Sequence, residues 1–328
     1  MKVLSTSQIR EADAYTITHE PISSLDLMER AAECLAAWFI HLFPARGPVY
    51  VIAGPGNNGG DGLALARLLT QEGYQVQVFC LAEQLSPDAQ QMLQRLEKLV
   101  EVAHIHAFKD LPQDLSSGIL VDALFGSGLS RPLSGLVAQA VEWMNALPLP
   151  KVAIDLPSGL LADAPSPGQA VAKADYTATF QSPKLAFFMP ENEEFVGRWS
   201  VLDIGLHPTF LAEVHTPYHW LSAASLPVLR KRRRHAHKGD MGRALLVAGS
   251  LGKMGAAVLA ARACLRAGAG LLTCHIPGVG YDIVQTAVPE ALVEVDEAEY
   301  YIKRTEWLVA GYDALGIGPG LDQKQGTI

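Results

Sequence analysis

A glycine-rich segment between an apolar run and an amphipathic helical pattern most constrains how this chain can fold. Residues 49–53 are apolar and largely β-branched, as in a strand covered on both faces of a sheet. A turn with five glycines follows, and residues 63–69 then repeat leucine and alanine at helical spacing. Glycines permit positive φ and close approach of a ligand, and a helix amino terminus attracts an anion. The segment therefore predicts a strand–turn–helix unit that binds a phosphate or pyrophosphate.

The same turn carries three oxygen-bearing side chains, Asn57, Asn58 and Asp61. The glycines satisfy the dinucleotide-binding spacing G-x-G-x-x-G, but the acid expected after the second strand is matched only loosely, by Glu83. Three side-chain oxygens in one tight turn suit a hard monovalent or divalent cation. The alternative is that these residues only tolerate a left-handed backbone and cap the helix.

Composition and charge narrow the class of protein. A chain of 328 residues favours two domains, and the net charge of −8 argues against nucleic-acid binding. No apolar run approaches the ~20 residues of a membrane span, and the first fifteen residues contain no hydrophobic signal core. We therefore expect a cytoplasmic protein with no membrane partner. Composition leaves open whether it is a monomer or a homo-oligomer.

Strand-like and helix-like segments alternate from residue 49 to about residue 205. This alternation predicts a three-layer αβα fold with a doubly wound, mostly parallel sheet, in which ligands bind beyond the carboxyl ends of the strands. Helices are expected outside it at 7–15 and 25–43, with Ser24 or Asp26 capping the second. The expected strands are residues 49–53, 75–81, 119–123, 151–155, 176–180 and 199–203.

A second glycine- and alanine-rich unit follows a break in composition. It is expected to contain a strand at 244–248, a helix at 256–268 and a strand at 271–275. We place one domain at 1–215, a linker with a basic run at 216–236 and a partial α/β domain at 237–328. A doubly wound domain of this size would leave an unpaired sheet edge, so we expect a truncated domain.

Three expected strands of the first domain end in candidate site residues. Asp122 and Asp155 end neighbouring strands, and each precedes a loop of small residues, the second of which contains Ser158. Two such aspartates beside an asparagine-rich turn indicate a site, although a single one is often a helix cap. For Lys184 and Arg131 the sequence leaves two roles open, a contact to a phosphate and an ordinary surface position.

Three motifs in the first domain carry a resemblance to a known family. G-P-G-N-N-G-G-D-G, V-D-A-L-F-G-S-G-L and I-D-L-P-S-G-L, in this order, resemble the NAD(P)H-hydrate epimerase family, the YjeF amino-terminal domain, over roughly residues 1–215. The opening I-R-E-A-D at 9–13 belongs to the resemblance. In the second domain, H-K-G-D-M-G at 237–242 and G-P-G at 318–320 resemble the ADP-dependent NAD(P)H-hydrate dehydratases, which are ribokinase-like. Together they are similar to bifunctional nicotinamide-hydrate repair enzymes.

The resemblance implies a function for the first domain. Its substrate would be NADH or NADPH hydrated at C6 of the nicotinamide ring, NAD(P)HX, whose R and S forms it would interconvert. Asn58, Asp122 and Ser158 match family positions that hold a potassium ion (K+). Asp155 is our candidate for the acid–base role. The positions that match contacts to the hydrated dinucleotide are Asn57, Asn58, Gly59, Gly60, Asp61, Gly126, Ser127, Gly128, Leu129, Ser130, Arg131, Pro132 and Asp155 in the first domain and Ala256 and Gly320 in the second.

The resemblance also implies a dehydratase half that uses ADP or ATP to return the S form to NAD(P)H. The family's glycine-rich nucleotide-binding stretch, with its catalytic aspartate, does not occur in these 328 residues. We therefore expect this chain to epimerise but not to dehydrate. A non-catalytic dinucleotide-binding or scaffold module on the same fold is the alternative, because a fold does not fix a function.

Overall fold

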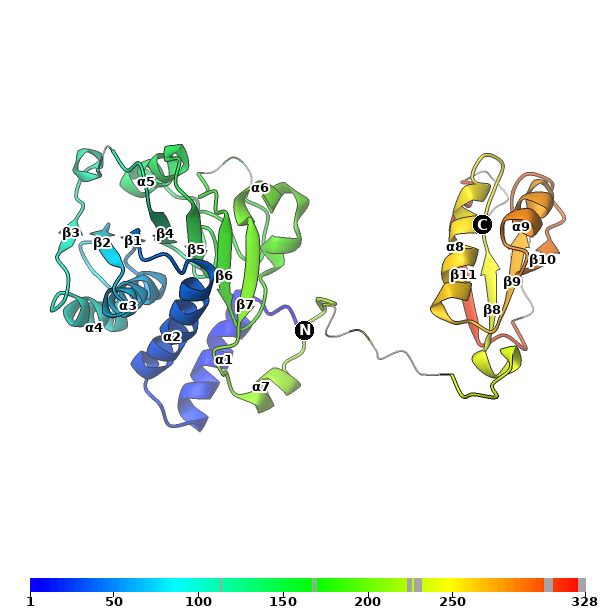
Figure 1. Ribbon diagram of the computed structural model, residues 1–328, viewed down its shortest axis with the longest axis horizontal. Coiled ribbons are helices and arrows are strands. Elements are labelled where there is room, and N and C mark those ends of the chain that lie inside the picture. Colours follow the sequence, from blue (N-terminus) through cyan, green and yellow to red (C-terminus); the bar gives the residue numbers. More distant parts are fainter. Residues whose placement is uncertain are drawn as a thin grey trace. The chain divides into compact units, whose positions relative to one another are not determined.

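The computed structural model describes residues 1–112, 114–166, 168, 170–222, 226, 232–303 and 309–323. The chain divides into two compact units, residues 1–226 and 227–328 (Figure 1). The predicted linker 216–236, with its basic run, lies partly outside the described residues, so the domain boundaries stay a prediction. No helix within the described ranges is long and apolar enough to cross a membrane.

The first unit is built on a seven-stranded sheet in the order β3-β2-β1-β4-β5-β6-β7. Every neighbouring pair is parallel, which confirms the predicted parallel sheet. Strand β3, which is only three residues long, was not predicted. The strands are β1 Pro48–Ala53, β2 Gln75–Cys80, β3 Val102–His104, β4 Ile119–Ala123, β5 Lys151–Ile154, β6 Tyr176–Phe180 and β7 Arg198–Leu202.

Helices cover both faces of this sheet, which confirms the three-layer architecture. One face packs against α2 Ser24–Leu42, α3 Asn57–Gln71 and α4 Pro87–Leu96. The other packs against α5 Gly135–Ala146. Outside these layers, α1 Thr6–His19 packs near α2 and α7. The shorter helices of this unit are α6 Glu193–Val196, α7 Pro208–Glu213, η1 Phe108–Asp110, η2 Leu185–Phe188 and η3 Pro190–Asn192.

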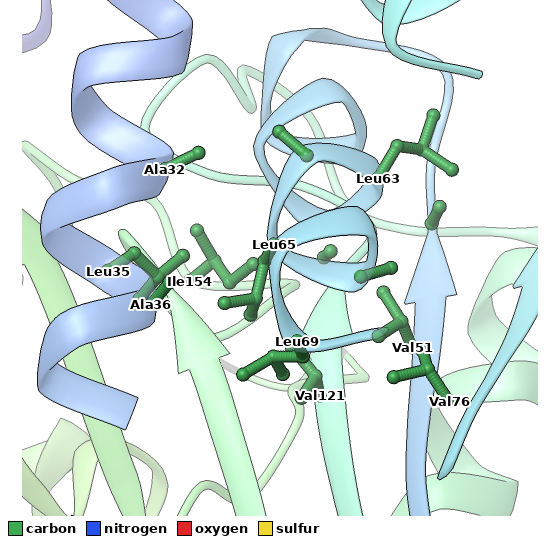
Figure 2. Close-up of a cluster of buried hydrophobic side chains, with 14 of the residues drawn as sticks. Ala32, Leu35, Ala36, Val51, Leu63, Leu65, Leu69, Val76, Val121 and Ile154 are labelled. Carbon is green, nitrogen blue, oxygen red and sulfur yellow. The ribbon is translucent and has the colours of Figure 1, made fainter. Parts of the chain in front are cut away.

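Helix α3 lies at the centre of the larger core. Leu65 and Leu69 of this helix pack between α2 and the strands that carry Val121 and Ile154 (Figure 2). Its first apolar turn is equally inaccessible, with Leu63 fully buried. A helix buried on this scale is fixed against the sheet, so its amino terminus is held firmly at the carboxyl edge of β1.

Two helix starts differ from the sequence prediction. The cap of α2 is Ser23 rather than Ser24 or Asp26, and Asp26 completes a capping box with it. Helix α3 begins at Asn57, so Asn57, Asn58 and Asp61 lie on its first turns rather than in a preceding loop. The oxygen-bearing side chains are therefore presented at helical spacing.

The second unit contains a four-stranded parallel sheet in the order β10-β9-β8-β11. Its strands are β8 Arg243–Val247, β9 Leu271–Ile276, β10 Leu292–Val295 and β11 Ala314–Ile317, and its helices are α8 Met254–Ala267, α9 Tyr281–Ala287, η5 Lys238–Met241 and η6 Gly278–Gly280. The predicted strand–helix–strand start is confirmed. The later elements α9, β10 and β11 were not foreseen, because their segments are short and lack a clear apolar period.

Candidate functional site

The candidate site lies at the carboxyl ends of β1, β4 and β5. The sheet order reverses between β1 and β4, since β2 lies on one side of β1 and β4 on the other. In open α/β sheets this switch point opens a crevice where ligands bind. The segments that leave these three strands carry the predicted site residues, so the topology brings most of them to one edge.

Close packing requires glycine at positions 54 and 59. A Cβ at Gly54 would lie 2.0 Å from the carbonyl oxygen of Leu124, and one at Gly59 would lie 2.0 Å from that of Gly54. The expectation of positive φ was wrong for this segment, since none of its five glycines adopts it. Glycine is needed here because backbone touches backbone.

The two adjacent asparagines have different surroundings. Asn57 is exposed, and its Oδ1 accepts a hydrogen bond of 2.8 Å from the hydroxyl of Ser86. Both polar atoms of the Asn58 side chain are buried and have no hydrogen-bond partner among the described residues. A buried amide without partners costs free energy, so Asn58 is the residue whose environment most directly indicates a missing ligand.

Asp122 of β4 and Ser158, in the segment after β5, form a buried pair. Oδ2 of Asp122 accepts from the backbone N–H of Ser158 at 2.8 Å, and its Oδ1 lies 2.6 Å from the Ser158 hydroxyl. The hydroxyl also accepts from the N–H of Phe125 at 2.9 Å and lies 3.2 Å from the Phe125 carbonyl oxygen. Burial raises the pKa of Asp122 to about 6, although these hydrogen bonds oppose the rise. Carboxylate, hydroxyl and carbonyl oxygens thus gather in one place.

Gly126 joins this oxygen cluster to the neighbouring aspartate. A Cβ at Gly126 would lie 2.9 Å from Oδ1 of Asn58 and 3.1 Å from Oδ2 of Asp155. The next residue, Ser127, donates its N–H to the same Asp155 oxygen at 3.2 Å. The structure therefore brings Asn58, Gly126, Ser127 and Asp155 together, as the sequence predicted.

Asp155 is held by a buried lysine. Nζ of Lys184 lies 2.7 Å from Oδ1 of Asp155 and also donates to the hydroxyl of Thr179 at 2.8 Å. Burial alone would raise the pKa of Asp155, but the Lys184 ammonium and the hydrogen bond from Ser127 outweigh it and lower the pKa below its usual value. Lys184 is thus neither a surface lysine nor a free phosphate ligand, because its side chain is 2% exposed and its ammonium group is already paired.

The charge of Asp155 acts on two further carboxyl groups, those of Asp61 and Asp13. Burial, followed by the negative charges of Asp155 and Asp13, raises the pKa of Asp61 well above its usual value. Burial and the charge of Asp155 also raise the pKa of Asp13 to about 6, against the opposing effect of Lys184. The site therefore holds carboxyl groups with opposite pKa shifts, which is typical of acid–base catalysis.

Asp13 comes from helix α1, on which no site residue was predicted. Helix α1 meets the loop after β4 through Thr6, whose hydroxyl donates to the Ser127 carbonyl oxygen at 3.3 Å. One turn further, Nη2 of Arg10 lies 3.6 Å from the position of a Cβ at Gly128. The available signal was the spacing of Thr6, Arg10 and Asp13, which places all three on one helix face.

The remaining residues of the predicted loop are more loosely placed. The carbonyl oxygen of Gly126 accepts from the N–H of Leu129 at 3.2 Å, which closes a turn. Beyond that turn the chain is exposed at Gly128, Ser130, Arg131 and Pro132. Arg131 has no ion pair within the part of the chain that the structure describes.

In the second unit, the two predicted contact residues lie side by side. A Cβ at Gly320 would lie 3.1 Å from Cβ of Ala256 and 2.6 Å from the carbonyl oxygen of Lys253, and Gly320 has φ +71°. The carbonyl oxygen of Gly320 accepts from the hydroxyl of Ser250 at 2.7 Å. The amino terminus of α8 and the loop after β11 therefore form one small cluster.

Metal sites built from acidic, histidine and cysteine side chains do not account for either cluster. The residues that the structure describes contain no group of three or more such side chains that could hold a metal ion. The Asp122–Ser158 pair, with the Phe125 carbonyl oxygen, offers instead one carboxylate with hydroxyl and carbonyl oxygens.

Two family models match this chain. A model described as the YjeF-related protein N-terminus matches residues 24–186, and one described as NAD(P)H-hydrate dehydratase matches residues 244–328. The first range contains every predicted site residue of the first unit, and the second contains Ala256 and Gly320.

Curated relatives align along almost the whole chain. A bifunctional NAD(P)H-hydrate repair enzyme, Nnr, of Thermofilum pendens is 34% identical over 100% of this chain and 64% of its own length. The Nnr enzyme of Escherichia coli is 33% identical over 92% of this chain and 57% of its own length. The chain thus spans roughly three fifths of the length of these relatives.

A solved structure supports the fold. The crystal structure of yeast ynu0, YNL200c, matches with a TM-score of 0.55 and 26% sequence identity, covering 68% of this chain and 98% of the yeast chain.

Proposed function

The chain belongs to the family of bifunctional NAD(P)H-hydrate repair enzymes, and from this premise we propose that its first unit interconverts the R and S forms of hydrated NADH or NADPH. The observation that carries the proposal is the buried Asn58 amide without partners. A Cβ at Gly126 would lie close to both this amide and Asp155, and the adjoining Phe125 contacts Ser158 of the Asp122–Ser158 pair. Buried polar groups of this kind can bind a ligand, whereas a scaffold would not need them.

The chemistry of the substrate matches the residues. C6 of a hydrated nicotinamide ring carries both a hydroxyl group and the ring nitrogen, so inversion requires one of these bonds to break and form again on the other face. A carboxylate beside that oxygen moves the proton. We assign this role to Asp155, which enters the reaction as a carboxylate because Lys184 stabilises its charge. The ionised form accepts a proton and so acts as the base.

The oxygen cluster is suited to K+. Potassium is a hard cation that prefers neutral and anionic oxygen ligands. We propose that Asn58, Asp122 and Ser158 hold it, with the Phe125 carbonyl oxygen beside them. The unsatisfied Asn58 amide and the single buried carboxylate support a singly charged ion. When bound, the ion supplies fixed positive charge that orients the loops and the substrate diphosphate.

The dinucleotide is proposed to bind over the start of α3 and the loop after β4. The first N–H groups of α3 and the positive end of its dipole favour a phosphate there. The proposed contacts in this unit are Asn57, Asn58, Gly59, Gly60, Asp61, Gly126, Ser127, Gly128, Leu129, Ser130, Arg131, Pro132 and Asp155. Arg131 and Ser130, exposed here, would serve the outer part of the substrate.

The proposal is tested by incubating the chain with purified R-hydrate and following the S form, with and without K+. Faster appearance of the S form than in the enzyme-free control, and dependence on K+, are expected. Binding of the hydrate without acceleration would instead support the non-catalytic binding module.

We further propose that the second unit takes part in the ADP- or ATP-dependent dehydration of the S form, with Ala256 and Gly320 touching the substrate. The expectation that these 328 residues do not dehydrate on their own stays a prediction. Supplying S-hydrate with ADP or ATP and measuring NAD(P)H absorbance tests it, and nucleotide-dependent absorbance would prove the expectation wrong.

A further inference from the structure

Helix α1 forms a wall of the candidate site that no assigned role explains. Its residues Thr6, Arg10 and Asp13 lie one turn apart along a single face. The first touches Ser127 and the second reaches toward Gly128, so the face is directed at the loop after β4. Asp13, the last of the three, lies where the charges of Asp155 and Lys184 act on it, and its own charge acts on Asp61.

We propose that Asp13 is a second catalytic residue of the epimerisation, which donates a proton to the oxygen that leaves C6 while Asp155 receives one from the incoming water. The inference rests on the proposed function. It supplies the general acid, since the proposed function assigns only a base, Asp155.

The division of roles follows from the contacts of the two carboxyl groups. Asp155 has an ammonium group at 2.7 Å and an N–H at 3.2 Å, both of which favour its ionised form. Asp13 has neither an ion pair nor a side-chain hydrogen bond within the described residues, and it is half-buried beside a fixed negative charge. Such an environment favours the protonated form. Two carboxyl groups with opposite environments are the usual arrangement for an acid and a base in one site.

The proposed reaction conserves protons and electrons. The Asp13 carboxyl group gives its proton to the C6 hydroxyl, the C6–O bond breaks, and its electron pair leaves with the oxygen as water. The lone pair of the ring nitrogen closes a double bond to C6, so the ring carries one positive charge. Water then adds to the opposite face of C6 and gives its proton to the Asp155 carboxylate. Transfer of that proton from Asp155 to Asp13 restores the starting state.

The other charged groups around α1 do not take over this role. The ammonium group of Lys184 is paired with Asp155. Arg10, on the same face of α1, is a cation and does not donate a proton as an acid. Asp61 of α3 carries a third carboxyl group, and burial followed by the charges of Asp155 and Asp13 raises its pKa. Arg30 of α2 is paired with Glu20. On the side of α7, His207 lies against Tyr15 and His19.

The test compares Asp13→Asn with Glu11→Gln, a control at an exposed position on the same helix. With the R-hydrate in saturating K+, Asp13→Asn is expected to lower kcat by about 10²–10³-fold with KM changed by less than about three-fold, whereas Glu11→Gln retains both. The wild-type kcat should fall as pH rises through about 6, where Asp13 loses its proton, and the residual activity of Asp13→Asn should lack this limb.

The outcomes distinguish a failure of the proposed epimerase function from a failure of the role assigned to Asp13. A wild-type chain that binds the hydrate without accelerating epimerisation overturns the proposed function, and Asp13 loses its role with it. An active wild type with Asp13→Asn unchanged in kcat and in pH profile overturns only the role of Asp13. A fall in kcat with the pH limb retained would give Asp13 a structural role and equally contradict the inference.

Discussion

Nζ of Lys184 lies 2.7 Å from Oδ1 of Asp155, and both side chains are largely shielded from solvent. The ammonium group also donates to the hydroxyl of Thr179 and to the carbonyl oxygens of Phe180 and Ser182. A buried charge with four oxygen partners is well satisfied, so the pair keeps the catalytic candidate ionised without leaving a polar group unpaired. The same pair makes activity and stability depend on one contact.

Asp155→Asn is expected to affect both activity and stability. Epimerisation should slow by about 10²–10⁴-fold, the range for losing a positioned acid–base group. Because Lys184 is then a buried charge without a counter-ion, the free energy of unfolding should fall by about 3–5 kcal/mol. Progress curves with R-hydrate and urea denaturation measure the two effects.

The double variant Asp155→Asn with Lys184→Met serves as the control. Removing both charges should recover most of the lost stability, since a neutral pair of similar volume is often tolerated, while activity stays low. Recovery of activity along with stability would mean that Asp155 acts through the fold alone.

Asn58→Ala is expected to remove the effect of K+ on stability. An ion that binds only the folded state stabilises it in proportion to the logarithm of its concentration, so the wild-type Tm should rise as K+ replaces a large organic cation at constant ionic strength. Asn57→Ala is the matched control, because that side chain bonds to Ser86 instead and should leave the rise intact. Equal K+ dependence in both variants would place the ion elsewhere.

Gly59→Ala is expected to destabilise the first unit strongly. Its new methyl group would lie 2.0 Å from the Gly54 carbonyl oxygen, whereas a methyl group at Gly56 would meet nothing within 4 Å. Overpacking of backbone against backbone costs at least about 1–3 kcal/mol, so urea denaturation should show a lower midpoint for Gly59→Ala than for Gly56→Ala. Similar midpoints would show that the segment has room to shift.

The stability of the first unit should depend on pH through Asp13. Its pKa is about 6 in the folded state against 3.8 for the free group, so folding favours the protonated carboxyl group. This contribution is fully present below pH 3.8 and is lost as pH rises through about 6. The stability difference between wild type and Asp13→Asn should therefore shift in favour of the variant between pH 4 and pH 7. A difference that is constant over that range would show that Asp13 is solvated.

The sheet of the first unit was predictable because its strands bury both faces. Residues 119–123 and 176–180 were placed to the residue, since continuous apolar or β-branched runs leave few alternatives. The three residues of β3, of which two are exposed, carry no such pattern and were missed. In the second unit β11 escaped for a similar reason, because its residues are exposed.

The site was predictable where chemistry is local in sequence and not where it depends on tertiary contacts. Asp122 and Asp155 could be placed at one edge in advance because they end neighbouring parallel strands, and the family resemblance grouped Ser158 with Asp122. The role of Lys184 could not, since its burial depends on how the turn after β6 folds back over Thr179. Asp13 was overlooked because a helix that precedes the sheet gives no sign of which strand ends it faces.

The backbone at Asp155 has a consequence for how this position can vary over evolutionary time. Its φ of +64° lies in the left-handed region, which aspartate, asparagine and glycine enter at low cost and other residues do not. Glutamate would conserve the charge but incur backbone strain, while asparagine and glycine would relieve strain at the expense of the charge. Selection for the reaction and selection for the turn therefore converge on a single amino acid, and few single-nucleotide changes at this codon are neutral.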